Sequence, residues 1–180
     1  MKNKLLLTGK PQVGKTAIIQ NVLTHVNVDS LTIGGFYTRE IRENGNRVGF
    51  NVETILSKEK GILAHVDFNS SFRVGKYGVN KYAFEKIMLK ELNICTKNKV
   101  DLIIIDEIGK MEIISDVFCK KILEILNGSI PVFGVVKKAK EKFLDIIYNL
   151  QNIEIIEVKI SNREKVFVKV LNWLQNVYKL

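Results

Sequence analysis

Short apolar runs alternate along the chain with longer segments in which apolar residues recur every three or four positions. A strand that is buried on both faces reads as a continuous apolar run, so the runs predict strands at residues 5–8, 100–106, 130–136 and 153–160. The periodic segments predict helices at residues 15–26, 115–127, 139–150 and 161–174, and a further one after Asn80. Strands that alternate with helices are typical of a parallel sheet with helices on both faces.

Two of these helices show an apolar face, and two helix starts carry capping residues. Asn80 is a favoured N-cap residue, and Ser161 followed three positions later by Glu164 has the spacing of a capping box. The residues expected to face the core are Phe84, Ile87, Met88 and Leu92 in the helix after Asn80, and Phe118, Ile122, Ile125 and Leu126 in the helix at 115–127.

A hairpin interrupts the alternation of strands and helices. Residues 36–42 and 47–55 read as two strands, and the turn between them at 43–46 contains an Asn-Gly pair, which is typical of tight hairpins. A short strand at 61–66 follows a polar turn. We therefore expect an antiparallel hairpin inserted into a mostly parallel α/β sheet.

Composition and charge narrow the class of protein. The 180 residues, of which 46% are hydrophobic and 26% charged, fit one globular domain spanning 1–180. The formal net charge of +9 comes mostly from scattered lysines without interleaved aromatics, so nucleic acid is a lesser alternative to a small phosphate-rich partner. No apolar segment has membrane-spanning length and no targeting segment precedes the first strand, so we expect a cytoplasmic monomer.

The segment directly after the first strand matches the pattern G-x-x-x-x-G-K-[ST], known as Walker A. The backbone N–H groups of such a loop, with the helix N-terminus behind it, form a cradle for phosphates. Lys15 is expected to reach the outer phosphates and the Thr16 hydroxyl to bind Mg²⁺. The alternative, a chance glycine-rich turn, is disfavoured by the flanking strand and helix. The expected nucleotide-binding residues here are Gly9, Lys10, Pro11, Gln12, Val13, Gly14, Lys15, Thr16 and Ala17.

A pair of acids ends the apolar run at 100–106, as a Walker B strand requires. Asp106 is the carboxylate expected to hold hydrated Mg²⁺. Glu107 is placed to accept a proton from an attacking water, with Glu112 as the next candidate. The alternatives are an Asp106 held for structural reasons and a solvated Glu107.

Arginine is scarce, and three of the five arginines lie in the hairpin, at Arg39, Arg42 and Arg47. We expect Arg39 and Arg42 to lie nearer the ligand than Arg47. Residues three apart in a regular strand point to opposite faces, so Arg39 is chosen as the one that faces the nucleotide. The alternative is a solvated hairpin surface.

Two further cations are candidates for the site. Lys110 follows the acidic strand and could supply positive charge to the transferred phosphate, or could merely pair with Glu107 or Glu112. Arg163 lies in the loop after the last strand and could stack on the nucleobase, or could be only a first-turn helix residue.

Several segments together resemble the family of cancer-related and thermophile nucleoside-triphosphatases. They lie at residues 9–16, 34–40, 45–50, 73–79, 106–112 and 162–163, and the most particular are Gly-Gly-Phe-Tyr-Thr at 34–38 and Asp-Glu-Ile-Gly-Lys-Met-Glu at 106–112. The resemblance implies an ATP-binding, Mg²⁺-dependent hydrolase that converts nucleoside triphosphates to diphosphate and phosphate slowly, with loose base preference. It also implies a three-layer P-loop NTPase fold with core strand order 5-1-4-3-2, in which the strand at 130–136 lies between the loop strand and the acidic strand.

Two other functions stay open at this point. A nucleotide or nucleoside kinase would need an acceptor pocket, for which the hairpin with Arg39, Arg42 and Arg47 could form a wall. A nucleotide-dependent module that binds RNA or protein is supported by the net charge alone.

Overall fold

The computed structural model describes residues 2–25 and 31–178. Its strands are β1 (Lys4–Thr8), β2 (Ile33–Glu43), β3 (Asn46–Thr54), β4 (Lys60–His65), β5 (Arg73–Val74), β6 (Tyr77–Val79), β7 (Leu102–Ile108), β8 (Val132–Val136) and β9 (Ile153–Glu157). Its helices are α1 (Lys15–His25), α2 (Lys81–Asn98), α3 (Asp116–Asn127), α4 (Lys142–Tyr148) and α5 (Arg163–Tyr178), with 3-10 turns η2 (Glu112–Ile114) and η3 (Ile160–Asn162). Within the described ranges no helix is both long and apolar enough to span a membrane.

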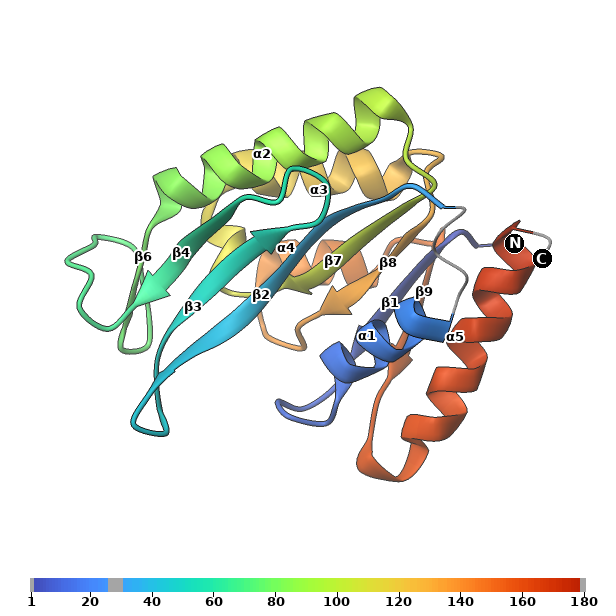
Figure 1. Ribbon diagram of the computed structural model, residues 1–180, viewed down its shortest axis with the longest axis horizontal. Coiled ribbons are helices and arrows are strands. Elements are labelled where there is room, and N and C mark those ends of the chain that lie inside the picture. Colours follow the sequence, from blue (N-terminus) through green and yellow to red (C-terminus); the bar gives the residue numbers. More distant parts are fainter. Residues whose placement is uncertain (1, 26–30, 179–180) are drawn as a thin grey trace.

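All the strands join one nine-stranded sheet in the order β5-β6-β4-β3-β2-β7-β8-β1-β9 (Figure 1). The pairs β2–β7, β7–β8, β8–β1 and β1–β9 are parallel. The pairs β2–β3, β3–β4, β4–β6 and β6–β5 are antiparallel. The long strand β2 therefore joins the two halves of the sheet, because it pairs with β7 in the parallel half and with β3 in the antiparallel half.

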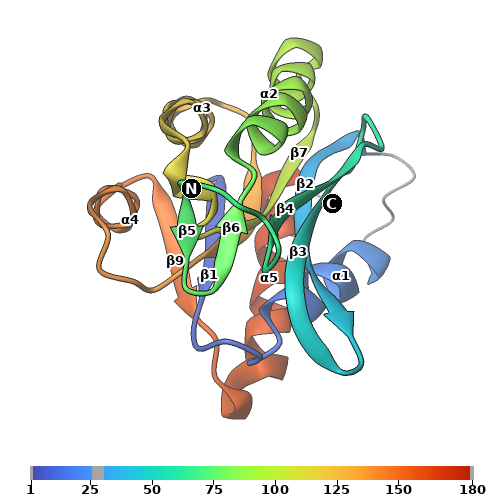
Figure 2. The same ribbon diagram turned by 90° about the vertical axis from the view of Figure 1, so that its left-hand side faces the viewer.

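Helices cover both faces of the sheet, with α2, α3 and α4 on one face and α1 and α5 on the other (Figures 1 and 2). The alternation of side chains along β1 shows why two cores form. Leu6 packs into the cluster that includes residues of α2, α3 and α4, whereas Leu5 and Leu7 pack into the cluster that includes residues of α1 and α5. The mostly parallel α/β architecture predicted from the sequence is thus present.

The edges of several elements differ from the prediction. The acidic strand does not stop at residue 106 but continues through Ile108, and the strand predicted at 153–160 ends at Glu157 before η3. The helix predicted at 139–150 is the shorter α4, and Val26 lies outside the described residues. The strands β5 and β6 were not predicted, because strands of two and three residues are too short to show an alternating pattern.

One of the two capping predictions is confirmed and the other is wrong. The Asn80 side chain caps α2 by accepting a hydrogen bond from the Ala83 N–H, 3.1 Å away. The capping box of Ser161 and Glu164 is wrong, because the 3-10 turn already occupies residues 160–162. Instead the Asn162 side chain accepts a hydrogen bond of 2.7 Å from the Lys159 N–H.

Candidate functional site

The loop after β1 has a backbone that glycine alone fits easily. Gly9 has a φ of +141° and Gly14 a φ of +95°. A Cβ atom on Gly9 would lie 2.4 Å from the Val158 carbonyl oxygen, so a side chain there would force the loop away from the end of β9. The Ile18 N–H donates to the Gly14 carbonyl oxygen at 3.0 Å and closes the first turn of α1. The predicted strand–loop–helix unit is therefore formed.

The Lys15 side chain folds back over this loop. Its Nζ donates to the carbonyl oxygens of Gly9 at 3.1 Å and Lys10 at 2.9 Å. Partial burial lowers the pKa of Lys15, while the charges of Glu107 and Asp106 act against that shift. The ammonium group is thus held in the loop and faces the two acids at the end of β7.

Asp106 is a buried carboxylate with spare binding capacity. Its Oδ2 has no hydrogen-bond partner among the described residues. Burial raises the pKa of Asp106 to about 6, and the nearby Thr16 hydroxyl and the charge of Lys15 oppose the rise. A buried oxygen without a partner is unfavourable, so this site is suited to an added cation or polar ligand.

Glu107 and Glu112 approach each other across Gly109. A Cβ on Gly109 would lie 2.8 Å from Glu107 Oε1 and 2.9 Å from Glu112 Oε2. The Gly109 N–H donates to Glu112 Oε2 at 3.1 Å. Burial, followed by the charge of Glu107, raises the pKa of Glu112 to about 8. Glu112 therefore favours its neutral, protonated form.

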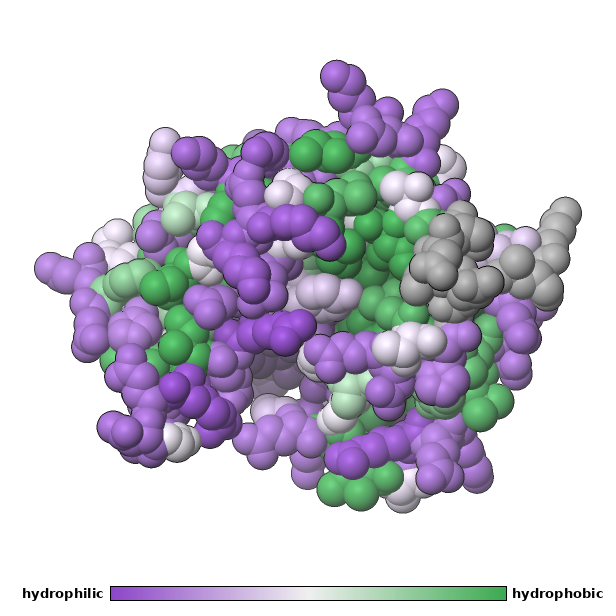
Figure 3. Space-filling view, in the orientation of Figure 1, coloured by the Kyte–Doolittle hydropathy of each residue, from purple (hydrophilic) through white to green (hydrophobic). Residues whose placement is uncertain are grey.

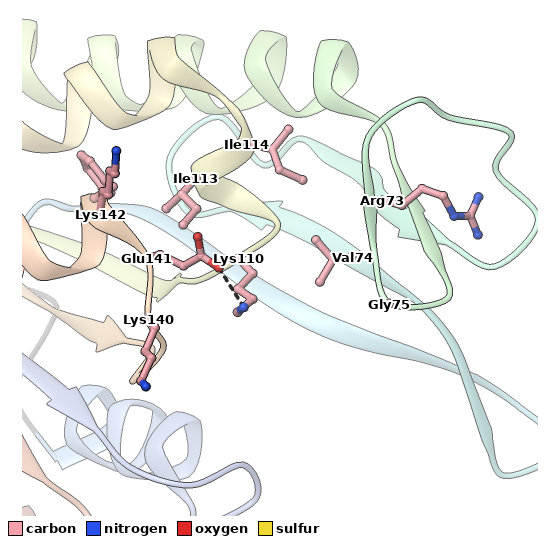
Figure 4. A pocket seen from close by; sticks show the side chains of 10 residues that line it. Arg73, Val74, Gly75, Lys110, Ile113, Ile114, Lys140, Glu141 and Lys142 are labelled. Carbon is pink, nitrogen blue, oxygen red and sulfur yellow. Dashed lines mark ion pairs between the residues drawn. The ribbon is translucent and has the colours of Figure 1, made fainter.

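Lys110 pairs with the glutamate that precedes α4. Its Nζ lies 2.8 Å from Glu141 Oε1, so neither Glu107 nor Glu112, the two partners expected from the sequence, pairs with it. The pair stands in a cavity of about 690 Å³, whose wall includes Val74, Ile113 and Ile114 (Figure 4). Arg73 also borders the cavity, but its guanidinium points outward (Figure 4) and donates to the Phe68 and Lys76 carbonyl oxygens.

The hairpin arginines separate onto two faces of the sheet. Arg39 Nε lies 3.8 Å from Glu53 Oε2, and the charge of Arg39 reaches Asp106 strongly enough to oppose the rise of its pKa. Arg42 and Arg47 instead share Glu40 on the other face. Arg42 was expected to lie nearer the ligand than Arg47; because both side chains pair with Glu40, these ion pairs do not distinguish them, and the expectation stays a prediction.

Arg163 joins the start of α5 to the loop after β1. Its Nε donates to the Val13 carbonyl oxygen at 2.6 Å, and its guanidinium covers Gly14. Val13 itself is buried beneath the loop, whereas Lys10, Pro11, Gln12 and Ala17 are exposed. Arg163 therefore contacts the loop itself, a contact that the sequence did not predict.

The sequence reasoning missed Lys137. This lysine follows β8 directly, and its Nζ lies 3.8 Å from Glu107 Oε1. A signal was present, because a residue after a strand that lies between β1 and β7 has to be near the loop after β1 and the acids of β7.

The loop after β1, the acids of β7 and Lys137 lie at one edge of the molecule, where the parallel strands end. Figure 3 shows that the surface is hollowed between the β2–β3 hairpin and the loop after β1, and that hydrophilic residues surround the hollow. Within the described residues no group of three or more His, Cys, Asp or Glu side chains is arranged to hold a metal ion. A metal at this edge would have Asp106 as its main protein ligand and would need oxygens from a ligand as well.

The chain is similar to known proteins in sequence and in fold. Residues 4–171 match a protein family described as NTPase. The nucleoside-triphosphatase THEP1 of Thermotoga sp. (strain RQ2) is 40% identical over 172 residues, which are 96% of this chain and 95% of that protein.

Two solved structures are similar over nearly their whole length. The crystal structure of THEP1 from the hyperthermophile Aquifex aeolicus has a TM-score of 0.83 at 28% identity, over 96% of this chain and 99% of that one. The solution structure of a human cancer-related nucleoside triphosphatase has a TM-score of 0.78 at 31% identity, over 96% and 97% of the two chains. By sequence and by fold, this chain belongs to the NTPase family.

Proposed function

We propose that this protein is a Mg²⁺-dependent hydrolase that converts nucleoside triphosphates, ATP and GTP among them, to diphosphate and phosphate. The observation that carries the proposal is the buried Oδ2 of Asp106, which has no hydrogen-bond partner within the described part of the chain, in a carboxylate whose charge acts on Lys15. The names of the relatives, nucleoside-triphosphatases, support the same activity.

The loop is proposed to bind the phosphates. The exposed backbone from Lys10 to Gln12 and the N-terminus of α1 offer N–H donors, as anion sites at helix starts do. Lys15, now hydrogen-bonded to two loop carbonyls, exchanges them for the outer phosphates when a nucleotide arrives.

Asp106 and Thr16 are proposed to hold Mg²⁺. The carboxylate oxygen without a partner and the nearby hydroxyl form a donor set of hard oxygens, which Mg²⁺ prefers, and phosphate oxygens and water would complete it. When bound, the ion neutralises negative charge on the phosphates.

Glu107 is proposed to activate the attacking water. It follows Asp106 directly in β7, and its Oε1 lies against Gly109 at the edge of the sheet where the parallel strands end. It accepts the proton of the water as the water oxygen bonds to the outer phosphorus and the bond from phosphorus to the bridging oxygen breaks.

Arg39 and Arg163 are proposed to contact the nucleotide outside the phosphate loop. Arg163 lies against Gly14 and can extend toward a base bound beside α5, where stacking on its plane would not discriminate between bases. Arg39 is exposed on the face that carries Tyr37 and lies on the side of Asp106.

The test is phosphate release from the purified protein with ATP, GTP, CTP or UTP, with Mg²⁺ and with a chelator. We expect release with each triphosphate, dependence on the metal, and loss of most activity in Lys15→Ala while circular dichroism stays unchanged. Near wild-type turnover in a folded Lys15→Ala protein would contradict the assignment of the loop.

A second candidate function, phosphoryl transfer to a small acceptor, is favoured by one observation. The cavity beside Lys110 combines apolar side chains with a Lys–Glu pair and lies next to the segment that carries Glu107. The same assay with added nucleosides and nucleoside monophosphates distinguishes the two functions, since transfer would form a phosphorylated acceptor in place of free phosphate.

A further inference from the structure

The position of Lys137 in the sheet gives it access to the reacting phosphate. It is the first residue after β8, which pairs with β1 on one side and with β7 on the other. Its N–H donates to the Ile108 carbonyl oxygen at 3.0 Å, which fixes its backbone at the end of β7. Parallel strands end at the same edge, so Lys137 starts between the loop that carries Lys15 and the strand that carries Glu107.

The side chain of Lys137 lies among the charged groups of the site. Its Nζ is 3.8 Å from Glu107 Oε1, and 42% of the side chain is exposed. Its positive charge also acts on two other groups. Burial is the main cause of the lowered pKa of Lys15, and the charge of Lys137 adds to that lowering. Burial is also the main cause of the raised pKa of Glu112, and the charge of Lys137 opposes that rise. Lys137 is thus near the groups proposed to hold the phosphates and to activate the water.

Three neighbouring cations have other partners. Lys110 Nζ pairs with Glu141 at 2.8 Å, and Lys138 Nζ lies 3.5 Å from Glu157 Oε1. Arg163 is bound to the carbonyl oxygen of Val13. The contact of Lys137 with Glu107 is long and half exposed, so it is weak and can be exchanged for a phosphate oxygen at little cost.

We propose that Lys137 is a catalytic residue that stabilises the charge of the transferred phosphoryl group, in the role considered above for Lys110. The inference rests on the proposed hydrolysis. While the water oxygen bonds to the outer phosphorus and the bond to the bridging oxygen breaks, the Lys137 side chain donates hydrogen bonds to the phosphoryl oxygens. Its positive charge from within the chain substitutes for an arginine supplied by a partner.

The experiment compares Lys137→Met with Lys138→Met, a matched control in which the adjacent exposed lysine loses its charge. In Lys137→Met we expect kcat to fall by about 10²–10³-fold, as for loss of one transition-state donor, with little change in the affinity for nucleoside diphosphate. Lys138→Met should stay close to the wild type, and Lys137→Arg should keep a large part of the activity because it keeps the charge.

A second measurement separates direct stabilisation from an effect through Glu107. Diphosphate with aluminium fluoride mimics the transferred group, and its trapping should be weakened by Lys137→Met even when Glu107 is already replaced by glutamine. Trapping that is unaffected in that background, or wild-type turnover of Lys137→Met, would overturn the inference while leaving the hydrolase proposal intact. A wild-type protein that releases no phosphate would overturn both.

Discussion

Glu112 approaches Glu107 across a glycine. Burial, and after it the charge of Glu107, raises the pKa of Glu112 and favours its neutral form. Gly109 makes this approach feasible, because a Cβ at that position would collide with both side chains. The protonation of Glu112 is thus set by the groups immediately around that one residue.

Replacing each member of the pair with glutamine tests this division. Glu107→Gln keeps the size of the side chain but cannot accept a proton, so we expect binding of triphosphate to persist while hydrolysis falls by on the order of 10²–10⁴-fold. Glu112→Gln should reduce hydrolysis far less at pH 7, because Glu112 is already neutral there. A larger loss in Glu112→Gln than in Glu107→Gln, measured by phosphate release, would reverse the assignment.

The same pair makes stability depend on pH. In the unfolded chain the pKa of Glu112 returns to its ordinary value of 4.5, whereas in the fold it is about 8. Between these values the folded protein holds a proton that the unfolded chain releases, so Glu112 lowers the free energy of unfolding progressively as pH rises from about 4.5 to about 8. Denaturant unfolding at several pH values should show that Glu112→Gln gains stability relative to the wild type along this range. Parallel curves for the two proteins would contradict the assignment.

At the scale of elements, the loop after β1 is held from two sides. Its strand lies between β8 and β9, and the first residue of α5, Arg163, binds the carbonyl oxygen of Val13. The end of the chain thus supports a segment near its beginning, which a pattern local to either segment does not reveal.

Arg163→Ala tests this support. Loss of a charged hydrogen bond to the loop should raise KM by about 10–100-fold for every triphosphate alike, with kcat nearly unchanged, since a hydrogen bond to a charged group contributes about 1.5–3 kcal/mol. Lys165→Ala, an exposed change on the same helix, is the control. An effect confined to one base would instead indicate that Arg163 reads the base by hydrogen bonds.

At the scale of the whole molecule, the buried Glu91 connects a helix to two segments of the sheet that are far from it in sequence. It lies on α2, and its Oε1 accepts hydrogen bonds from the N–H groups of Gly35 and Leu56, both at 2.9 Å. Its Oε2 accepts from the Ser57 N–H at 2.9 Å. One carboxylate therefore holds the start of β2 and the turn after β3 against the helix layer.

Glu91→Gln should destabilise the fold. The amide nitrogen cannot accept a hydrogen bond, so the orientation that keeps the contacts of Gly35 and Leu56 places two donors together at Ser57. We expect a loss of about 1–3 kcal/mol in the free energy of unfolding, measured with denaturant. Glu43→Gln, an exposed change at the end of β2, should stay within about 0.5 kcal/mol of the wild type, and an equal effect of both changes would refute the role of Glu91.

Local patterns were sufficient for the elements that carry the site. The glycine-rich loop after a continuous apolar strand, the acids at the end of a second such strand, and the cap at Asn80 each depend on residues close together in sequence. Helix and strand periods and capping preferences act over a few residues, so the sequence alone determined the α/β class and the strand–loop–helix unit. It also marked Lys15, Asp106 and Glu107 as candidates for one site.

Contacts between distant segments were decided by the tertiary structure. The partner of Lys110 is Glu141 rather than a glutamate near it in sequence, because α4 starts beside the end of β7. The pairing of β8 between β1 and β7 brings Lys137 to Glu107, and the burial of Glu112 makes it neutral. Desolvation and ion pairing depend on which side chains surround a group in space, and the order of residues along the chain does not specify those neighbours.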